Sequence, residues 1–205
     1  DDYEELVCTG DLHYPSEVLP PGCTGLTGNV FIEPDAVSFE AIDRLTYIGG
    51  ALHISATESL LSFSMDNLTY IGGGLHISDT ESLLSFSMDS LDTVDGSIDI
   101  YNTTNLDSFT LDNLTRIQLG LRIYDNEGLA YFSMNALVST NWDINISGNS
   151  ALTGFGLDSL EFGGDFYIRD NASLCESTVE EFECYLIYSG GTTYFSDNAT
   201  CEADD

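Results

Sequence analysis

The sequence predicts an all-β fold, a parallel β-solenoid of about seven rungs with 23-residue repeats. Five self-similar blocks of 23 residues follow one another, at 62–84, 85–107, 108–130, 131–153 and 154–176. Hydrophobic residues recur in register across these blocks, and a short period-two pattern, typical of a strand, falls at the same place in each. Such ladders indicate stacked coils, because one coil cannot bury its apolar face until the next coil covers it.

Four hydrophobic ladders make up the expected core. They are Phe63, Phe86, Phe109, Phe132 and Phe155; Met65, Met88, Leu111, Met134 and Leu157; Leu45, Leu68, Leu91, Leu114, Leu137 and Leu160; and Leu60, Leu83, Leu106, Leu129, Leu152 and Leu174. The strand reads apolar-x-Ile, with seven central isoleucines at Ile32, Ile54, Ile77, Ile100, Ile123, Ile146 and Ile168. At about 4.8 Å between strands, these rungs span roughly 34 Å.

The chain divides into three segments. Residues 1–25 contain Pro15, Pro20 and Pro21 and predict an irregular N-terminal cap, residues 26–176 form the solenoid, and residues 177–205 form a C-terminal cap. Within the last segment, Ser177 to Tyr185 is the best candidate for a helix. Glycines such as Gly49, Gly72 and Gly96 precede many strands, and we expect them to supply the unusual φ of a tight corner.

The cysteines lie only near the two ends of the chain. Cys8 and Cys23 are the natural first pair, and Cys175, Cys184 and Cys201 follow the repeats. This placement predicts disulfide-stapled caps around a disulfide-free middle. One of the last three is left over, either as a free buried thiol or in a bond to another chain.

The charge of the chain limits its partners. It carries 35 acidic residues against four arginines and no lysine, a formal net charge of -31. Nucleic acid and anionic membrane surfaces are excluded as partners, because both need clustered Lys and Arg. No apolar run approaches the roughly 18 residues of a membrane span, and no signal or anchor motif is present. We expect cations, basic proteins, carbohydrates or further copies of this chain as partners.

Six Asn-x-Ser/Thr sequons predict N-linked glycans. They are at Asn67, Asn102, Asn113, Asn145, Asn171 and Asn198. Together with the terminal cysteines they predict an extracellular or cell-surface glycoprotein, present here as the mature secreted chain.

The run LTYIGGGLHIS, and its recurrence as Leu-x-x-Ile-Gly-Gly-x-Leu-x-Ile with a Leu closing the unit, resembles the receptor L-domain family. That family includes the ligand-binding domains of insulin-receptor and EGF-receptor ectodomains and microbial cell-surface relatives. The resemblance covers about residues 26–176. It implies a single-stranded right-handed β-helix with disulfides at its ends, and it implies that ligands bind the exposed strand face.

The outward strand positions are the candidate binding face. The residues expected to carry it are Tyr101, Arg122, Tyr124, Tyr167 and Arg169. Tyr and Arg are the residue types enriched at interface hot spots. The alternative is an ordinary solvated sheet face. A glycan on Asn145 would partly obstruct this face, so a bare Asn145 favours recognition and an occupied one favours a structural role.

Two further groups have the chemistry of metal ligands. Asp66, Asp89 and Asp112 recur in one column, where calcium could relieve their repulsion. The alternative, which we favour, is that each Asp caps a corner by accepting backbone N–H bonds. His53 and His76 are one rung apart but have no evident third ligand, so we expect no other cofactor.

Nothing in the sequence marks a catalytic site. There is no nucleophile elbow, phosphate loop or metalloprotease helix, and Arg122 beside Asp99 is the nearest approach to a polysaccharide-lyase site. We therefore expect a non-enzymatic protein with a structural, self-assembling role as a surface-layer or filament subunit. The alternative is a recognition ectodomain that binds a protein or glycan through the strand face.

Overall fold

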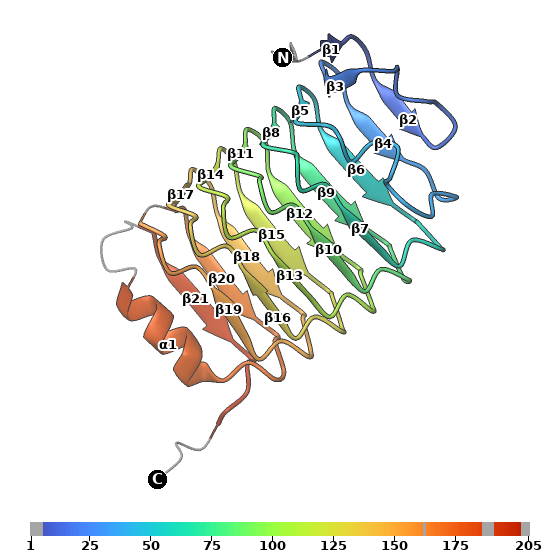
Figure 1. The fold of residues 1–205 in the computed structure, drawn as a ribbon. Helices are drawn as coiled ribbons and strands as arrows, with labels where there is room; N and C mark the ends of the chain where they lie inside the picture. The colour runs from blue at the N-terminus through green and yellow to red at the C-terminus, as the bar shows by residue number, and fades with distance from the viewer. Residues whose placement is uncertain (1–5, 162, 186–190, 202–205) are drawn as a thin grey trace.

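The computed structural model describes residues 6–161, 163–185 and 191–201, without the side chains of residues 181 and 183–185. It is a parallel β-solenoid whose coils stack along one axis, as the repeats predict (Figure 1). Each coil contributes a strand to up to three sheets, and every strand pairs in parallel with its counterpart in the next coil.

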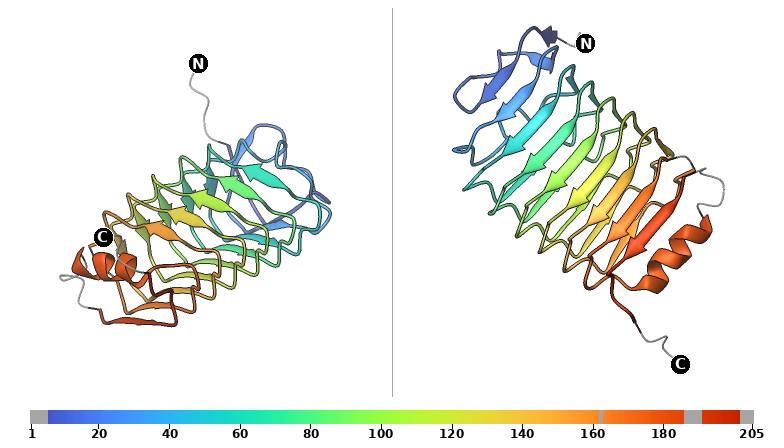
Figure 2. Two further views of the ribbon diagram at one scale, coloured as in Figure 1. Left: turned by 90° about the horizontal axis from the view of Figure 1, so that it is seen from below. Right: turned by 180° about the vertical axis from the view of Figure 1, so that it is seen from behind.

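The longest sheet has nine strands and contains all seven predicted rungs (Figure 2). In order they are β2 (Leu12–Tyr14), β4 (Val30–Ile32), β6 (Leu52–Ser55), β9 (Leu75–Ser78), β12 (Ile98–Tyr101), β15 (Leu121–Tyr124), β18 (Ile144–Ser147), β20 (Phe166–Arg169) and β21 (Thr193–Ser196). The predicted isoleucines stand opposite one another, as in the pairs Ile77–Ile100 and Ile100–Ile123.

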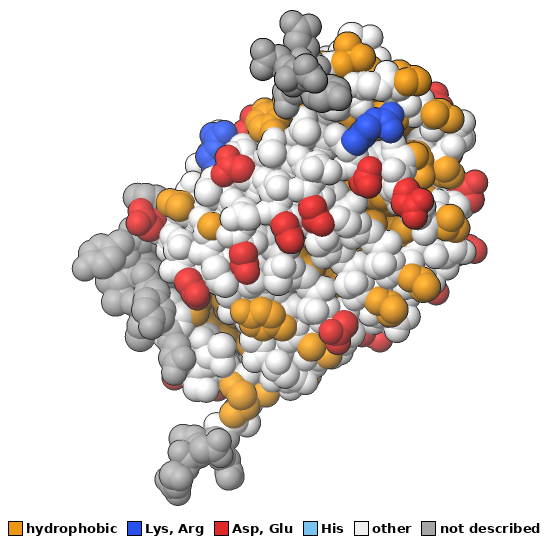
Figure 3. All heavy atoms as spheres, in the orientation of Figure 1, with side chains coloured by type: hydrophobic (Ala, Val, Ile, Leu, Met, Phe, Trp, Pro, Cys, Tyr) orange, Lys and Arg blue, Asp and Glu red, His pale blue; other side chains and the backbone are white. Residues whose placement is uncertain are grey.

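Two sheets of shorter strands close each coil. The seven-stranded sheet contains β1 (Leu6–Cys8), β3 (Cys23–Leu26), β5 (Tyr47–Ile48), β8 (Tyr70–Ile71), β11 (Thr93–Val94), β14 (Arg116–Ile117) and β17 (Ser139–Thr140). The five-stranded sheet contains β7 (Ser62–Ser64), β10 (Ser85–Ser87), β13 (Ser108–Thr110), β16 (Tyr131–Ser133) and β19 (Gly154–Gly156). Over the short strands, Figure 3 shows acidic side chains following one another across the coils, with few Lys or Arg between them.

The core lies inside the coils and is built from the predicted ladders. All four ladders are buried, apart from a half-buried Phe155. Phe86 stacks on Phe63 and on Phe109 with ring centroids 5.2 and 5.0 Å apart. Burying a large side chain contributes roughly 1.5–3 kcal/mol, so the repeated ladders are the main source of stability.

The glycines before the strands do not have the role that the sequence suggested. Their φ angles are not positive; the described glycines with positive φ are Gly10, Gly22 and Gly148. Instead, they let neighbouring coils approach closely. A Cβ on Gly72 would lie 2.3 Å from the backbone oxygen of Gly49, and one on Gly96 would lie 2.5 Å from the backbone of Gly73.

A second corner holds a buried polar ladder that the sequence analysis missed. Each strand of the long sheet from β6 to β21 is followed by a residue with φ near +55° or by Gly148, as at Asp79, Asn102 and Asp125. The next side chain turns inward, and these side chains form the ladder Thr57, Thr80, Thr103, Asn126, Asn149, Asn171 and Asn198. Asn126 shows the pattern, because its Nδ2 donates to the Ile100 carbonyl at 3.0 Å and its Oδ1 accepts the Thr103 N–H at 3.1 Å.

Both end segments continue the solenoid. The N-terminal segment, expected to be irregular, contributes β2, which pairs with β4, and β3, which pairs with β5. Strands of three and four residues on either side of a proline-containing turn are too short to be recognised from a period-two pattern. At the other end, β21 pairs with β20, and α1 (Glu176–Tyr185), one residue longer than predicted, lies against the last coil. Val179 is buried, and Phe182 contacts Phe166 edge-on.

Disulfides hold both ends, as predicted. Cys8 pairs with Cys23, and Cys175 pairs with Cys201. Cys184 is the cysteine left outside these pairs; it belongs to α1, and its side chain lies outside the described residues. The described residues contain no helix that is both long and apolar enough to cross a membrane.

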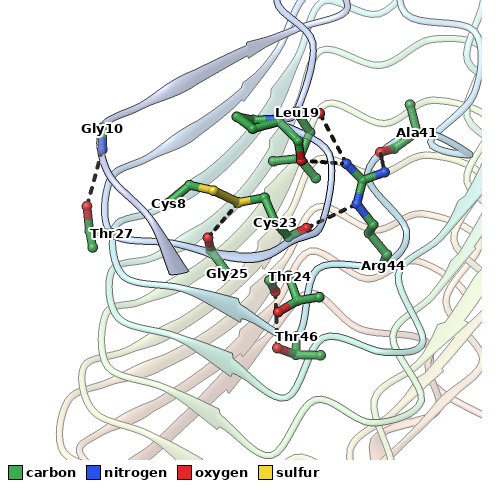
Figure 4. Close-up of a disulfide and its surroundings, with 11 residues drawn as sticks. Cys8, Gly10, Leu19, Cys23, Thr24, Gly25, Thr27, Ala41, Arg44 and Thr46 are labelled. Carbon is green, nitrogen blue, oxygen red and sulfur yellow. Dashed lines mark hydrogen bonds between the residues drawn. A yellow bond between two sulfur atoms is a disulfide. The ribbon is translucent and has the colours of Figure 1, made fainter. Parts of the chain in front are cut away.

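Arg44 supports the N-terminal disulfide. Its guanidinium donates to the carbonyl oxygens of Cys23, Leu19, Pro20 and Ala41 at 3.0–3.1 Å (Figure 4). One of the four arginines therefore serves the fold and is not available to a ligand.

Candidate binding site on the outer face of the nine-stranded sheet

The nine-stranded sheet presents two rows of outward side chains, which we call the outer face. Because strand side chains alternate in direction, the strand register places these residues in line. The first row is His13, Phe31, His53, His76, Asp99, Arg122, Asn145, Tyr167 and Tyr194. The second row is Ser55, Ser78, Tyr101, Tyr124, Ser147, Arg169 and Ser196. All five predicted binding residues lie in these rows.

Stacked rings occupy the N-terminal half of the first row. His13, Phe31, His53 and His76 stack in sequence with centroids 4.8–4.9 Å apart. Burial, and to a lesser extent the neighbouring His76, lowers the pKa of His53. The described residues contain no group of three or more His, Cys, Asp or Glu that could hold a metal ion.

Asp99 organises the centre of the first row. It accepts hydrogen bonds from the Arg122 guanidinium on both oxygens, and its Oδ2 lies 2.9 Å from His76 Nδ1 and 2.8 Å from Ser97 Oγ. Burial alone would raise the pKa of Asp99, but the hydrogen bonds from His76, Arg122 and Ser97 outweigh it and hold that pKa at about 2. Asp99 is therefore ionised at neutral pH, and it fixes the direction of Arg122.

Ser97, His76 and Asp99 are not arranged as a catalytic serine with a histidine base. Ser97 and His76 both bind Asp99, so the serine hydroxyl is bonded to the carboxylate and not to the imidazole. The Nε2 of His76 lies over Gly74. The hydrogen bond to Asp99 also raises the pKa of Arg122, which makes this guanidinium a fixed cation.

A hollow of about 450 Å³ opens in the C-terminal half of the outer face. It is lined by Ser97, Leu119, Gly120, Arg122, Trp142, Asp143, Asn145, Tyr167 and Arg169. The strands β15, β18 and β20 supply Arg122, Asn145, Tyr167 and Arg169, and the corners before β15 and β18 supply Leu119 and Trp142. Three of the five predicted residues thus meet in one place.

The remaining two predicted residues form a separate pair. Tyr101 and Tyr124 stack with centroids 4.8 Å apart in the second row, outside the residues that line the hollow. Trp142 and Leu119, which are 65% and 40% exposed, are not among the binding residues that the sequence predicts. They lie in corners and not on strands, so the alternation that revealed the other residues does not reach them.

Arg169 is the uncommitted cation of the outer face. Its guanidinium carbon lies 6.0 Å from the ring centroid of Tyr167, and the guanidinium makes no ion pair or hydrogen bond with any described residue. Tyr167 in turn stacks on Tyr194 at 5.1 Å. A cation on a stacked aromatic platform is available for contact with a ligand.

The asparagines of the six sequons differ in their exposure to solvent. Asn67, Asn102 and Asn113 are exposed, and Asn145 is half-buried at the hollow. Asn171, predicted to carry a glycan, is fully buried, and its Nδ2 donates to the Ile146 carbonyl and to Asn198 Oδ1. A glycan on this nitrogen would have to displace the polar ladder, so the burial of Asn171 argues against a glycan there in the folded chain. Asn198 is half-buried, and its Nδ2 donates to the Ile168 carbonyl.

Two of the three aspartates proposed for calcium bind backbone N–H groups of the neighbouring coil. Asp66 Oδ1 accepts the Asp89 N–H at 3.1 Å, and Asp112 Oδ1 accepts the Asn135 N–H at 2.9 Å. The hydroxyl of Ser64, with the Asp89 N–H, lowers the pKa of Asp66. For Asp66 and Asp112 these bonds match the corner-capping alternative, except that each of the two carboxylates caps the next coil and not its own.

No protein-family model, no curated protein and no solved structure matches this chain. A parallel β-solenoid, the coarse fold that the receptor L-domain resemblance implied, is present, and it has about seven turns, as the repeats predicted.

Proposed function

We propose that this chain is a non-enzymatic, extracellular recognition module, related to receptor L domains, whose outer face binds a ligand. The hollow at Arg122, Trp142, Tyr167 and Arg169 carries this proposal. Aromatic and Arg side chains around a depression are typical of ligand and interface sites. The two disulfides support a location outside the cytosol.

The chemistry of the outer face supports binding over catalysis. Asp99 is already ionised and bonded by three side chains, so it has no proton to donate at neutral pH. Arg122 is held as a cation. Acid–base catalysis needs a group whose pKa lies near the working pH, and neither residue offers one.

The experiment compares two triple variants on protein and glycan arrays. Tyr124→Ala/Tyr167→Ala/Arg169→Ala removes exposed parts of the outer face without orphaning Asp99. Leu61→Ala/Leu84→Ala/Tyr131→Ala removes exposed large side chains elsewhere and is the control. We expect the fluorescently labelled outer-face variant to lose at least tenfold in binding, while the control keeps it. Equal binding by both variants would exclude the outer face.

A second role, self-assembly, is favoured by one observation. Strand β1 is an edge of the seven-stranded sheet, and it exposes Leu6 and Val7 by 50% and 44%. An exposed apolar edge strand is a template for pairing with another chain. If copies assemble through this edge into a layer or filament, Leu6→Glu/Val7→Glu should reduce the particle mass in light scattering to that of one chain. A mass that is unchanged by this variant excludes the edge as the contact.

A further inference from the structure

We propose, resting on the recognition role above, that the hollow binds a neutral saccharide whose ring stacks on Trp142. Its volume, about 450 Å³, lies in the range of roughly 300–1,000 Å³ found for small-ligand sites. This volume suits one or two sugar rings, with the rest of a longer glycan outside.

Trp142 supplies an apolar platform. It is the single Trp of the chain, and 65% of it is exposed, although Trp is usually well buried. The backbone beneath it is held, because the Trp142 carbonyl accepts from Thr140 Oγ1 at 2.9 Å and from the Gly164 N–H at 3.1 Å. The electron-rich face of an indole attracts weakly positive C–H groups. One face of a pyranose ring presents such groups.

The polar groups of the hollow match hydroxyls. Arg122 uses Nε and Nη2 for Asp99, so some of its five N–H donors remain for a ligand. Asn145 Oδ1 is buried and accepts no hydrogen bond from a described residue. Because the last torsion of Asn is soft, a small rotation can offer this oxygen to a ligand hydroxyl. A sugar hydroxyl both donates and accepts, so it satisfies both groups.

The charges around the hollow favour a neutral ligand. Asp99 neutralises Arg122, and Asp143 and Arg169, whose charges have opposite signs, both line the hollow. The hollow is therefore close to neutral within a chain of net charge -31, whose field repels anions. A uronic-acid ligand gains little electrostatic attraction here, and a cationic ligand is repelled by two arginines. A polyhydroxyl ligand without charge avoids both penalties.

The test uses an array of neutral cello-, xylo-, manno- and chito-oligosaccharides beside charged oligogalacturonates, followed by calorimetry with the best binder. All proteins carry Ser147→Ala, which removes the sequon at Asn145 so that no glycan blocks the hollow, and keeps Asn145 itself. We expect neutral oligosaccharides to bind, Trp142→Ala to weaken binding at least tenfold, and Trp142→Phe to restore part of it. Tyr131→Ala, an exposed aromatic on the five-stranded sheet, should leave binding unchanged.

Three outcomes overturn the saccharide assignment. They are the absence of neutral-sugar binding, binding restricted to the oligogalacturonates, and binding that Trp142→Ala does not weaken. If a protein from the protein array binds instead, and the outer-face triple variant abolishes that binding, the recognition role stands while the saccharide ligand is excluded. If the control triple variant abolishes sugar binding equally, both proposals fail.

Discussion

At the scale of single residues, Asp99 shows how the outer face is kept in order. A buried carboxylate is costly unless its hydrogen bonds compensate. Three neighbouring side chains do so here, and in return Asp99 directs the guanidinium of Arg122 along the sheet. The polar contacts of the face are thus preorganised before any ligand arrives.

The lowered pKa of Asp99 predicts that the stability of the folded chain depends on pH. Its pKa falls from an ordinary value of 3.8 to about 2 in the folded chain. The folded state therefore gains roughly 2 kcal/mol, fully present above about pH 4 and lost as pH falls toward 2. In denaturant unfolding at pH 5, 3.5 and 2, Asp99→Asn should be less stable than the parent at pH 5. The gap should narrow markedly by pH 2, where Asp99 is about half protonated, while the contributions of the other carboxylates cancel in the comparison. A gap that is constant with pH would contradict the assignment.

Glycan occupancy is the second prediction at this scale. Asn67, Asn102 and Asn113 are exposed, so we expect them to carry glycans, and Asn171 should carry none because its amide is buried in the ladder. Peptide mass spectrometry of the native folded protein, after enzymatic release of glycans in heavy water, measures this site by site. A largely occupied Asn171 would show that the ladder does not form at that coil.

At the scale of elements, each coil depends on two corners with different requirements. One corner needs glycine because backbones of successive coils nearly touch, and the other needs a positive φ followed by a buried Thr or Asn. The long sheet lies between them, so both corners control how its strands align.

We expect truncation of a buried side chain in the polar ladder to cause a large loss of stability. Asn149 donates to the Ile123 carbonyl and accepts from the N–H and the Nδ2 of Asn126. Asn149→Ala leaves these buried groups without partners, at about 1–3 kcal/mol for each group that water cannot reach, so we expect a loss of roughly 2–4 kcal/mol in chemical denaturation. Asn105→Ala removes one exposed bond, to the Glu81 carbonyl, and should cost under about 1 kcal/mol. Equal losses would contradict the role of the ladder.

Close approach at the glycine corner predicts a contrast between two glycines. Gly72→Ala places a Cβ 2.3 Å from the backbone oxygen of Gly49, so the backbone must shift. We expect the free energy of unfolding to fall by about 1–3 kcal/mol. Gly154→Ala meets only Tyr131, at 3.7 Å, and should be nearly neutral. Thermal unfolding of both variants measures the difference. Similar melting temperatures would argue against tight stacking at this corner.

How much of this could be predicted from sequence depends on the residue type at each repeated position. The hydrophobic ladders are visible because Phe, Leu and Ile recur every 23 residues and belong in a core. The polar ladder recurs with the same spacing from Thr57 to Asn149, but Thr and Asn are ordinarily exposed, and the later steps change to 22 and 27 residues. Strand alternation placed Tyr167 and Arg169 on the outer face. Trp142 has no counterpart in the other repeats, so only the folded chain brings it to the hollow.

At the scale of the whole molecule, the net charge and the helix at one end of the solenoid favour a monomer. The net charge of -31 makes copies repel one another, and α1 lies against the last coil at one end. Light scattering from micromolar to near-millimolar protein should therefore give the mass of one 22.3 kDa chain plus its glycans, with or without chelator or reductant. Growth into filaments would instead favour self-assembly. A particle mass that falls on reduction would favour assembly through a disulfide of Cys184.

The position of a bound ligand in a crystal would decide whether the outer face is the binding surface. We would determine a crystal structure of the Ser147→Ala protein with the best array binder. Ligand density in the hollow, against Trp142 and within hydrogen-bond distance of Arg122 or Asn145, is the expected result. Density confined to the five-stranded sheet, to β1 or to the end at α1 would contradict the assignment of the outer face as the binding surface.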